Sequence, residues 1–164
     1  MNATIIYHSV TGNTKKMAEL IADTMNAVGG IAARTFPIQD VDVEFVKSSK
    51  CVIIGTPIYT AGATADIHNF LQNSLKEFEL EGKLGGAFAT ANYVHGGGEQ
   101  GIHSILDAMM CRGMMVYSGG AAFGVPVVHL GPVALGTQLD FTHDIFVEYA
   151  KRMANKSFEL FGKI

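Results

Sequence analysis

Short apolar runs alternate with longer amphipathic segments along most of this chain. The apolar runs predict strands over 3–7, 31–36, 50–55, 84–90 and 114–117. The run at 50–55 has Cys-Val-Ile-Ile at its centre and no polar alternation, which is typical of a strand buried on both faces. The pattern therefore predicts a sheet covered on both sides.

Helices are predicted between these strands, because apolar residues recur there at helical spacing. The first helix ends at Gly29-Gly30, a short helix covers 41–49, and a later one is closed by Gly113. The last helix is expected to begin near Asp140, as its N-cap. The expected inward-facing residues, helix by helix, are Met17, Leu20, Ile21 and Met25; Ile67, Phe70, Leu71 and Leu75; Ile102, Ile105, Leu106, Met109 and Met110; Phe146, Tyr149, Ala150 and Met153.

Strands that alternate with helices predict an α/β fold with a parallel, doubly wound sheet. The length of 164 residues suits one domain over 1–164, without an internal repeat or a long linker. Ligands of such sheets bind beyond the carboxyl ends of the strands. The loops after the first, third and fourth predicted strands are therefore the ones to inspect.

Charge and composition exclude several classes of function. The net charge of −3, without a Lys/Arg cluster larger than a pair, argues against nucleic-acid binding. The chain enters its first strand without a basic flank, so no signal peptide is expected, and the apolar stretch 121–135 is too broken by proline to span a membrane. Cys51 and Cys111 make neither a disulfide framework nor a metal spacing, so a cytoplasmic location and no metal are expected.

The first loop has the composition of an anion cradle. Backbone N–H groups at a helix N-terminus lack internal partners and attract negative charge. Ser9, Thr11, Asn13 and Thr14 add side-chain donors at the same point. The pair Lys15-Lys16 follows in the first helical turn, where a bound anion would favour it, although two solvated lysines explain it equally well.

Other cradles and other uses of the fold do not match. The chain has no Gly-Lys-Ser/Thr tripeptide for a Walker loop, and only Gly12 where a dinucleotide fingerprint needs three glycines. Phospho-acceptor receiver domains need acidic residues where this chain has His8-Ser9 and Gly55-Thr56. The pattern Ser9-x-Thr11-Gly12-x-Thr14 resembles the FMN phosphate loop of the flavodoxin superfamily. This resemblance implies a three-layer α/β/α sandwich, a five-stranded parallel sheet of order 2-1-3-4-5, and FMN as cofactor. A plain Ser/Thr helix cap is the alternative.

Two further loops narrow the resemblance. Gly55-x-Pro57 with its aromatic-containing loop, and Gly96-Gly97-Gly98-Glu99-Gln100 at a helix start, are similar to those of WrbA-type NAD(P)H:quinone oxidoreductases and related reductases. The second loop is longer than usual for that branch, and Cys111-Arg112 replaces a frequent histidine pair, so no role for those histidines carries over. The resemblance implies that FMN is bound by Ser9, Thr11, Gly12, Asn13, Thr14, Pro57, Ile58, Tyr59, Thr60, Ala61, Gly62, Thr90, Ala91, Asn92, Tyr93, Gly96, Gly97 and Gly98.

Within these loops, aromatic residues are the candidates for contact with the flavin ring. Tyr59 or Tyr93 could stack on it, or both could sit at strand ends with hydroxyls in water. His95 could stabilise a reduced flavin, or be solvated. A backbone N–H from Thr60, Ala61 or Gly62 is the expected contact at flavin N5. No catalytic side chain is assigned, since FMN would carry the chemistry.

Carrier flavodoxins are strongly acidic around the flavin, whereas neither 56–65 nor 91–98 contains Asp or Glu here. The sequence therefore predicts an oxidoreductase that passes hydride from NAD(P)H through FMN to a flat acceptor such as a quinone or free flavin. The alternative is a one-electron carrier for a partner redox protein, and a third possibility is a non-catalytic flavin-sensing domain.

The stretch 118–139 is long, apolar and rich in Gly and Pro, without an obvious helix. It could be a subunit interface, a lid with His129 near the substrate, or a short hairpin at the sheet edge. The WrbA resemblance implies the first, in a homodimer or homotetramer.

Overall fold

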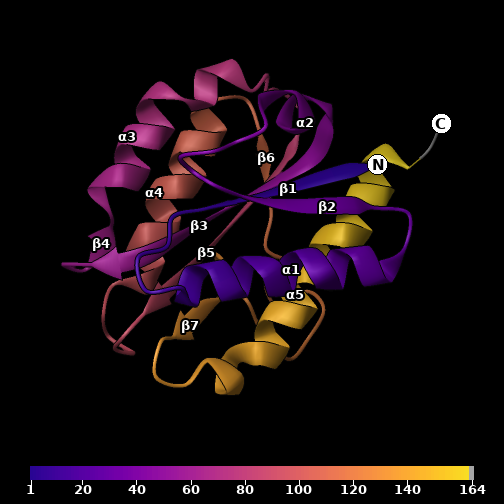
Figure 1. Ribbon diagram of the computed structural model, residues 1–164. Coiled ribbons are helices and arrows are strands. Elements are labelled where there is room, and N and C mark those ends of the chain that lie inside the picture. The colour runs from indigo at the N-terminus through magenta and orange to yellow at the C-terminus, as the bar shows by residue number, and fades with distance from the viewer. Residues whose placement is uncertain (163–164) are drawn as a thin grey trace.

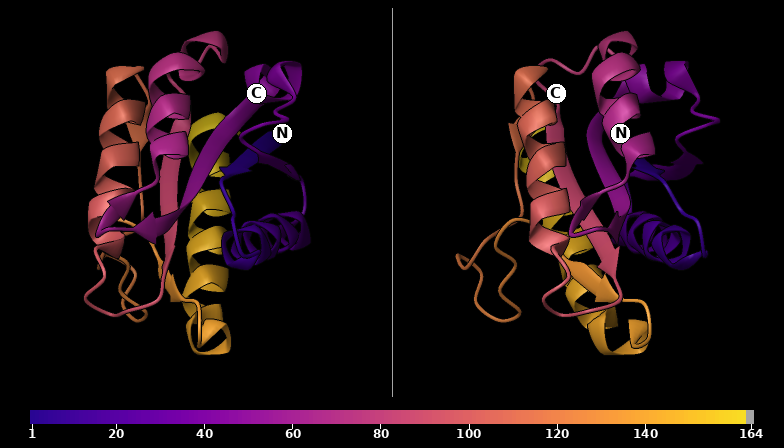
Figure 2. Two further views of the ribbon diagram at one scale, coloured as in Figure 1. Left: turned by 60° about the vertical axis from the view of Figure 1, so that its left-hand side comes forward. Right: turned by 90° about the vertical axis from the view of Figure 1, so that its left-hand side faces the viewer.

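A computed structural model describes residues 1–162 and shows a sheet between two layers of helices (Figures 1 and 2). The parallel strands lie in the order β2-β1-β3-β5-β6. Their bounds are β1 Asn2–Tyr7, β2 Ala32–Pro37, β3 Ser49–Tyr59, β5 Leu84–Ala91 and β6 Met115–Val116. When these five strands are numbered in chain order, they lie in the order 2-1-3-4-5. The predicted fold class is therefore confirmed.

Helices cover both faces of the sheet. Their bounds are α1 Asn13–Val28, α2 Val43–Ser48, α3 Ala65–Asn73, the short 3₁₀ helix η1 Leu75–Glu77, α4 Gly98–Cys111 and α5 Leu139–Phe161. Helices α1 and α5 pack on one face, and α3 and α4 on the other (Figure 1). No helix in the described chain is both long and apolar enough to cross a membrane.

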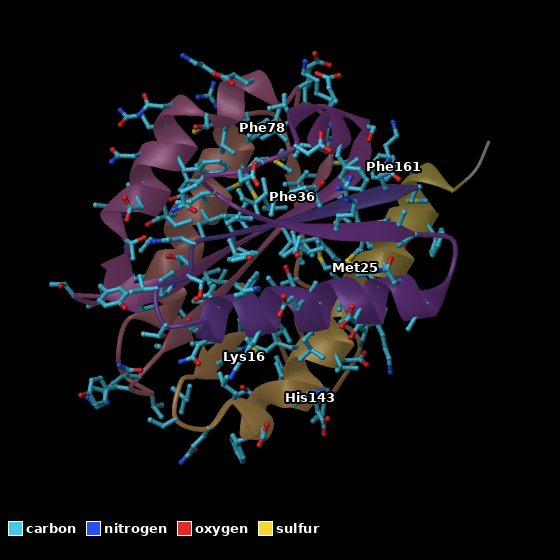
Figure 3. All side chains as sticks on the ribbon, in the orientation of Figure 1. Lys16, Met25, Phe36, Phe78, His143 and Phe161 are labelled. Carbon is cyan, nitrogen blue, oxygen red and sulfur yellow. The ribbon has the colours of Figure 1, made fainter. Side chains whose placement is uncertain are left out.

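Two apolar cores result, one on each side of the sheet. The first joins α1 and α5 to the sheet through residues such as Met25, Phe88 and Tyr149. The second joins α2, α3 and α4 through residues such as Val46, Phe70 and Ile105. In Figure 3, Met25 marks the first core and Phe78 the second, while Lys16 and His143 are exposed at the surface. Because β3 and β5 are buried on both sides, their sequences are apolar without alternation.

The third strand is longer than predicted. It continues from Gly55 through Pro57 to Tyr59, and then turns back into the two-residue strand β4, Gly62–Ala63. Pro57 ends the parallel ladder opposite Thr90, and a proline near a strand end removes few ladder hydrogen bonds. Pro57, Ile58 and Tyr59, which were predicted to lie in a loop, therefore belong to the strand.

The edge strand is split in two. β6 pairs with the start of β5 at Leu84 and Gly85, and a second short strand, β7 Val133–Leu135, pairs with its end. Residues 117–132 between them form an insertion closed by an antiparallel bridge between Gly120 and Val128. The bridge agrees with the interpretation of 118–139 as a hairpin at the sheet edge, and the subunit interface stays a prediction. β7 was not predicted from the sequence, because three residues are too few to show the alternation of a strand.

Smaller predictions also need correction. Leu75 lies in η1 and not in the third helix. Met110 is 50% exposed, so it is not part of the buried face of α4. The N-cap of α5 is Gln138, which makes no side-chain capping bond, and Asp140 lies inside the first turn. An acidic residue there is favourable by its interaction with the helix dipole, which explains its presence.

Stability is expected to fall with rising pH above about pH 9 because of Cys51. This thiol is buried in β3, and loss of solvation raises its pKa from 9.0 to about 12, against a smaller lowering by a hydrogen bond with Ser157. Above pH 9 the unfolded chain loses the proton that the folded chain keeps, so the unfolded state is favoured. One such group gives a slope of about 1.4 kcal/mol per pH unit.

Urea unfolding of reduced protein between pH 8 and pH 11 measures this effect. Cys51→Ala should remove one group's share of the slope, whereas Cys111→Ala, at an exposed thiol, should leave the slope as it is. Equal slopes in the parent and Cys51→Ala would contradict the assignment.

Candidate functional site

A cleft of about 450 Å³ opens at the carboxyl edge of the sheet, within the size range of small-molecule sites. The strand order reverses between β1 and β3, and sheets of this type bind ligands at such a point. The cleft is lined by Thr11, Asn13, Pro57, Ile58, Tyr59, Thr60, Ala61, Thr90, Ala91, Asn92, Tyr93, His95, Gly96 and Gly136. The structure thus brings together residues from all three predicted loops.

The loop after β1 carries hydrogen-bond donors that converge near Ser9. The Ser9 hydroxyl accepts hydrogen bonds from the N–H groups of Gly12 at 3.1 Å and Lys15 at 3.3 Å. Gly12 precedes α1 with φ of 91°, a left-handed conformation that glycine adopts without strain. The start of α1 therefore presents amides toward an oxygen acceptor, as anion sites at helix N-termini do.

Thr14 points into the protein and not toward the cleft. Its side chain is buried, and its hydroxyl lies 2.8 Å from the hydroxyl of Thr90 at the end of β5. This bond joins the first loop to the strand that carries the third loop. The residue links the two parts of the site and does not line the cleft itself.

The residues after β3 reach the cleft from a strand and a tight hairpin. Ile58 and Tyr59 pair with Ala63 and Gly62 of β4. Thr60 and Ala61 form the turn between them, and both have positive φ, 50° and 60°. Two successive left-handed residues are the conformation of a type I′ hairpin turn, which usually carries Gly or Asn. The edge of the cleft is thus built from a strained backbone segment.

The loop after β5 forms the opposite wall. Tyr93 is 68% exposed and Tyr59 is 49% exposed, and both border the cleft. The position of the tyrosines fits the predicted stacking role, which stays a prediction. Of the glycine triplet, only Gly96 lines the cleft. Gly97 packs on Ala61, and a Cβ on Gly98 would meet Val133, so neither lines the cleft.

Two more residues border the cleft: His95, for which the sequence left a flavin contact or a solvated ring open, and Gly136, which was not predicted. His95 lines the cleft with its ring 6.1 Å from that of Tyr93. Gly136 follows β7, and a Cβ there would lie 2.8 Å from Asn13 Nδ2 and 3.0 Å from Asn92 Oδ1. The signal for Gly136 was an apolar triplet followed by glycine, which repeats the pattern of a strand ending at a site.

Behind the hairpin lies a second, more open hollow, bordered by His8, Tyr59, Thr60, Gly62, Thr64 and Asp66 among others. His8 is buried, with Nδ1 2.8 Å from Thr64 Oγ1 and Nε2 3.6 Å from Asp66. Thr64 also caps α3. His8 therefore fastens the end of β1 to the start of α3, and Gly62 faces this hollow and not the cleft.

The insertion 117–132 contributes nothing to the lining of the cleft in the described chain, so the lid interpretation finds no support. Buried Arg152 fixes it to α5, donating from Nη1 to Gly120 O at 3.3 Å and from Nε to Glu148 at 3.2 Å. Phe123 and Val125 of the insertion remain exposed. The interpretation as a subunit interface stays a prediction.

The residues present fit FMN. A cradle of amides and hydroxyls without a lysine or arginine in the lining suits a phosphate monoester at a helix N-terminus. Two tyrosines and the peptide groups of the hairpin suit a flat ring with polar edges. Gly12 has a positive φ that disfavours a side chain, and a Cβ at Gly136 would collide with Asn13 and Asn92. No group of three or more metal-binding side chains occurs among residues 1–162.

The chain is similar to flavodoxins and to related proteins. A family model described as a flavodoxin domain matches residues 4–97. A flavodoxin of Clostridium saccharobutylicum is 38% identical over 98% of this chain and 100% of its own length. An NAD(P)H dehydrogenase (quinone) of Trichlorobacter lovleyi is 27% identical over 68% of each chain.

Among solved structures, the flavodoxin-like WrbA-like protein from Agrobacterium tumefaciens has the same fold. Its TM-score is 0.77 at 20% identity, covering 97% of this chain and 98% of the other. The predicted superfamily, with WrbA-type relatives, is therefore confirmed. Since the family model spans more than half of the chain and a flavodoxin aligns along nearly all of it, this protein belongs to the flavodoxin family.

Proposed function

We propose that the protein is an FMN-binding electron carrier, which takes electrons from one redox protein and delivers them to another. The observation that carries this proposal is the 38% identity to a flavodoxin, which extends over 98% of this chain and the whole of that relative. The match to the quinone dehydrogenase is weaker and covers 68% of both chains. The one-electron carrier therefore has more support than the NAD(P)H oxidoreductase.

The cleft and the loop after β1 that borders it would hold FMN in three places. The amides at the start of α1, with Ser9 and Thr11, would bind the phosphate. Asn92 and Gly136 would flank the ribityl part of FMN, which joins its phosphate to its ring. Tyr59 and Tyr93 would border the ring. FMN, when bound, would supply the reversible storage of electrons. The protein's own part is to hold the ring at an open edge, where a partner can approach.

The charge of the cleft supports a carrier over an NAD(P)H-dependent enzyme. The described residues that line the cleft include no lysine or arginine. NAD(P)H brings a diphosphate, and arginine and lysine are the side chains that usually bind such groups. Part of the cleft is also required by FMN itself. A second nucleotide would have few charged contacts there.

A second candidate is an NAD(P)H oxidoreductase that passes hydride through FMN to a quinone or free flavin. Two observations favour it: neither 56–65 nor 91–98 contains a carboxylate, and several relatives are named NAD(P)H dehydrogenase (quinone). A homodimer or homotetramer built on the exposed insertion would belong to this candidate. Both candidates are proposed to work in the cytoplasm, where Cys51 and Cys111 would stay reduced.

An anaerobic titration separates the two. FMN-loaded protein is mixed with NADPH, then NADH, then dithionite, while the visible absorption of the flavin is followed. A carrier should keep its absorption with both nicotinamides and lose it only with dithionite. Rapid bleaching by NADPH or NADH would establish the enzyme instead. Protein that does not retain FMN on gel filtration would contradict both.

A further inference from the structure

Two segments that border the cleft from different elements meet backbone to backbone at Gly97. Gly97 precedes α4 with φ of 90°, and a Cβ built on it would lie 2.3 Å from Ala61 O and 2.6 Å from Ala61 C. Ala61 belongs to the β3–β4 hairpin, which lies beside the loop before α4 in Figures 1 and 2. A side chain at position 97 would therefore push directly on a peptide group of the hairpin.

The hairpin needs such support. Thr60 and Ala61 both hold positive φ, which is unfavourable for residues that carry a Cβ. Conformations of this kind persist only where the surrounding structure holds them. Gly101 supplies a second contact from α4, since a Cβ there would lie 2.4 Å from Ile58 Cδ1 and 3.3 Å from Ala63 N. Gly97, just before α4, and Gly101, within it, thus both hold the hairpin.

The position of the hairpin matters because Thr60 and Ala61 line the cleft, whereas Gly97 does not. A flavin gains a proton at its ring edge on two-electron reduction, so that edge changes from hydrogen-bond acceptor to donor. Peptide N–H and C=O groups beside it interact unequally with the two states. Their placement therefore influences how much more tightly one redox state binds than the other.

We propose that Gly97 is a positioning residue which sets the redox preference of the bound flavin by holding Ala61 and the hairpin in place. This rests on the proposed FMN binding. Gly97 acts without touching the cofactor, through the contact with the Ala61 carbonyl. The loop before α4 and the β3–β4 hairpin then behave as one unit.

Gly97→Ala tests the proposal. The dissociation constant of oxidised FMN is measured by fluorescence, and the midpoint potential of the bound flavin by anaerobic titration with a reference dye. The two together give the ratio of dissociation constants for oxidised and reduced FMN. Gly97→Ala should change this ratio about two- to tenfold, the range expected when one backbone hydrogen bond is gained or lost.

Gly82→Ala is the matched control. Gly82 also has positive φ, 72°, but a Cβ there would meet nothing within 4 Å. It lies in the turn before β5, at the end of that strand away from the cleft. This variant carries similar backbone strain but lies away from the hairpin. Its ratio of dissociation constants for oxidised and reduced FMN should therefore equal that of the parent. An equal change in Gly82→Ala and Gly97→Ala would overturn the proposal.

Gly101→Ala covers the case in which Gly97→Ala does not fold. Its Cβ would meet the end of a flexible side chain, which can yield, so the hairpin should shift only slightly, and the ratio should still differ from the parent's by more than about a factor of 1.5. A ratio within a factor of 1.5 of the parent's in every folded variant would overturn the positioning role alone. A parent that fails to bind FMN would refute the proposed function as well.

Discussion

Gly12→Val is expected to weaken FMN binding about tenfold to 100-fold while the protein stays folded. Gly12 holds φ of 91° at the start of α1, and its N–H is directed at the Ser9 hydroxyl. A β-branched residue is strongly disfavoured in this conformation, so the loop must rearrange and its amides no longer converge. Strain of about 1–3 kcal/mol corresponds to this range of affinity.

Fluorescence titration of FMN with each variant measures the effect, and Gly29→Val is its control. Gly29 ends the same helix with φ of 84°, and a Cβ at either glycine would meet nothing within 4 Å. Both variants should lose similar stability in urea, but only Gly12→Val should lose affinity. If Gly29→Val lost as much affinity, or Gly12→Val none, the phosphate site would not be at this loop.

Phe88→Ala is expected to lower the free energy of unfolding by about 3–5 kcal/mol, the usual cost of removing a buried phenylalanine ring. Phe88 lies in β5 with no exposed surface, and its ring meets that of Phe146 edge-on, with centroids 5.7 Å apart. It also covers Gly55 of β3, where a Cβ would lie 2.0 Å from Phe88 Cζ. For a domain of this size, the midpoint of thermal unfolding should fall by about 6–20 °C.

Thermal and urea unfolding measure this loss, with Phe141→Ala as the control. Phe141 is 80% exposed, so its truncation should change stability by less than about 0.5 kcal/mol. A size exchange gives a sharper test. Gly55→Ala and Phe88→Leu should each lower the free energy of unfolding. The double variant should lose less than the sum of the two losses, because the new methyl group occupies the space that the smaller side chain leaves. Strict additivity would show that the ring does not rest on Gly55.

Much of the fold could be predicted because its strands are buried on both faces. Continuous runs such as Cys51 to Ile54 have few alternatives to a central strand. The first loop could be assigned because its chemistry is local, with glycine, hydroxyls and a helix start adjacent in the sequence.

The rest depends on contacts between distant segments. In the sequence, Gly97 is one glycine of a triplet, and only the fold brings Ala61 against it. The apolar triplet before Gly136 indicates the end of a strand, but only the fold brings this glycine beside Asn13 and Asn92. β7 is only three residues long and follows an insertion, so pairing with β5 defines it and periodicity cannot. Pro57 predicts the end of a strand, although the ladder continues to it.

The split edge strand has a consequence for self-association. An uninterrupted edge offers a row of free N–H and C=O groups on which another chain can add a strand, a first step toward aggregates. Here that edge consists of β6, two residues long, and β7, three residues long, with the insertion bulging out between them. Neither piece offers enough backbone for a stable added strand. The insertion thus gives this side of the sheet a built-in protection against edge-to-edge polymerisation.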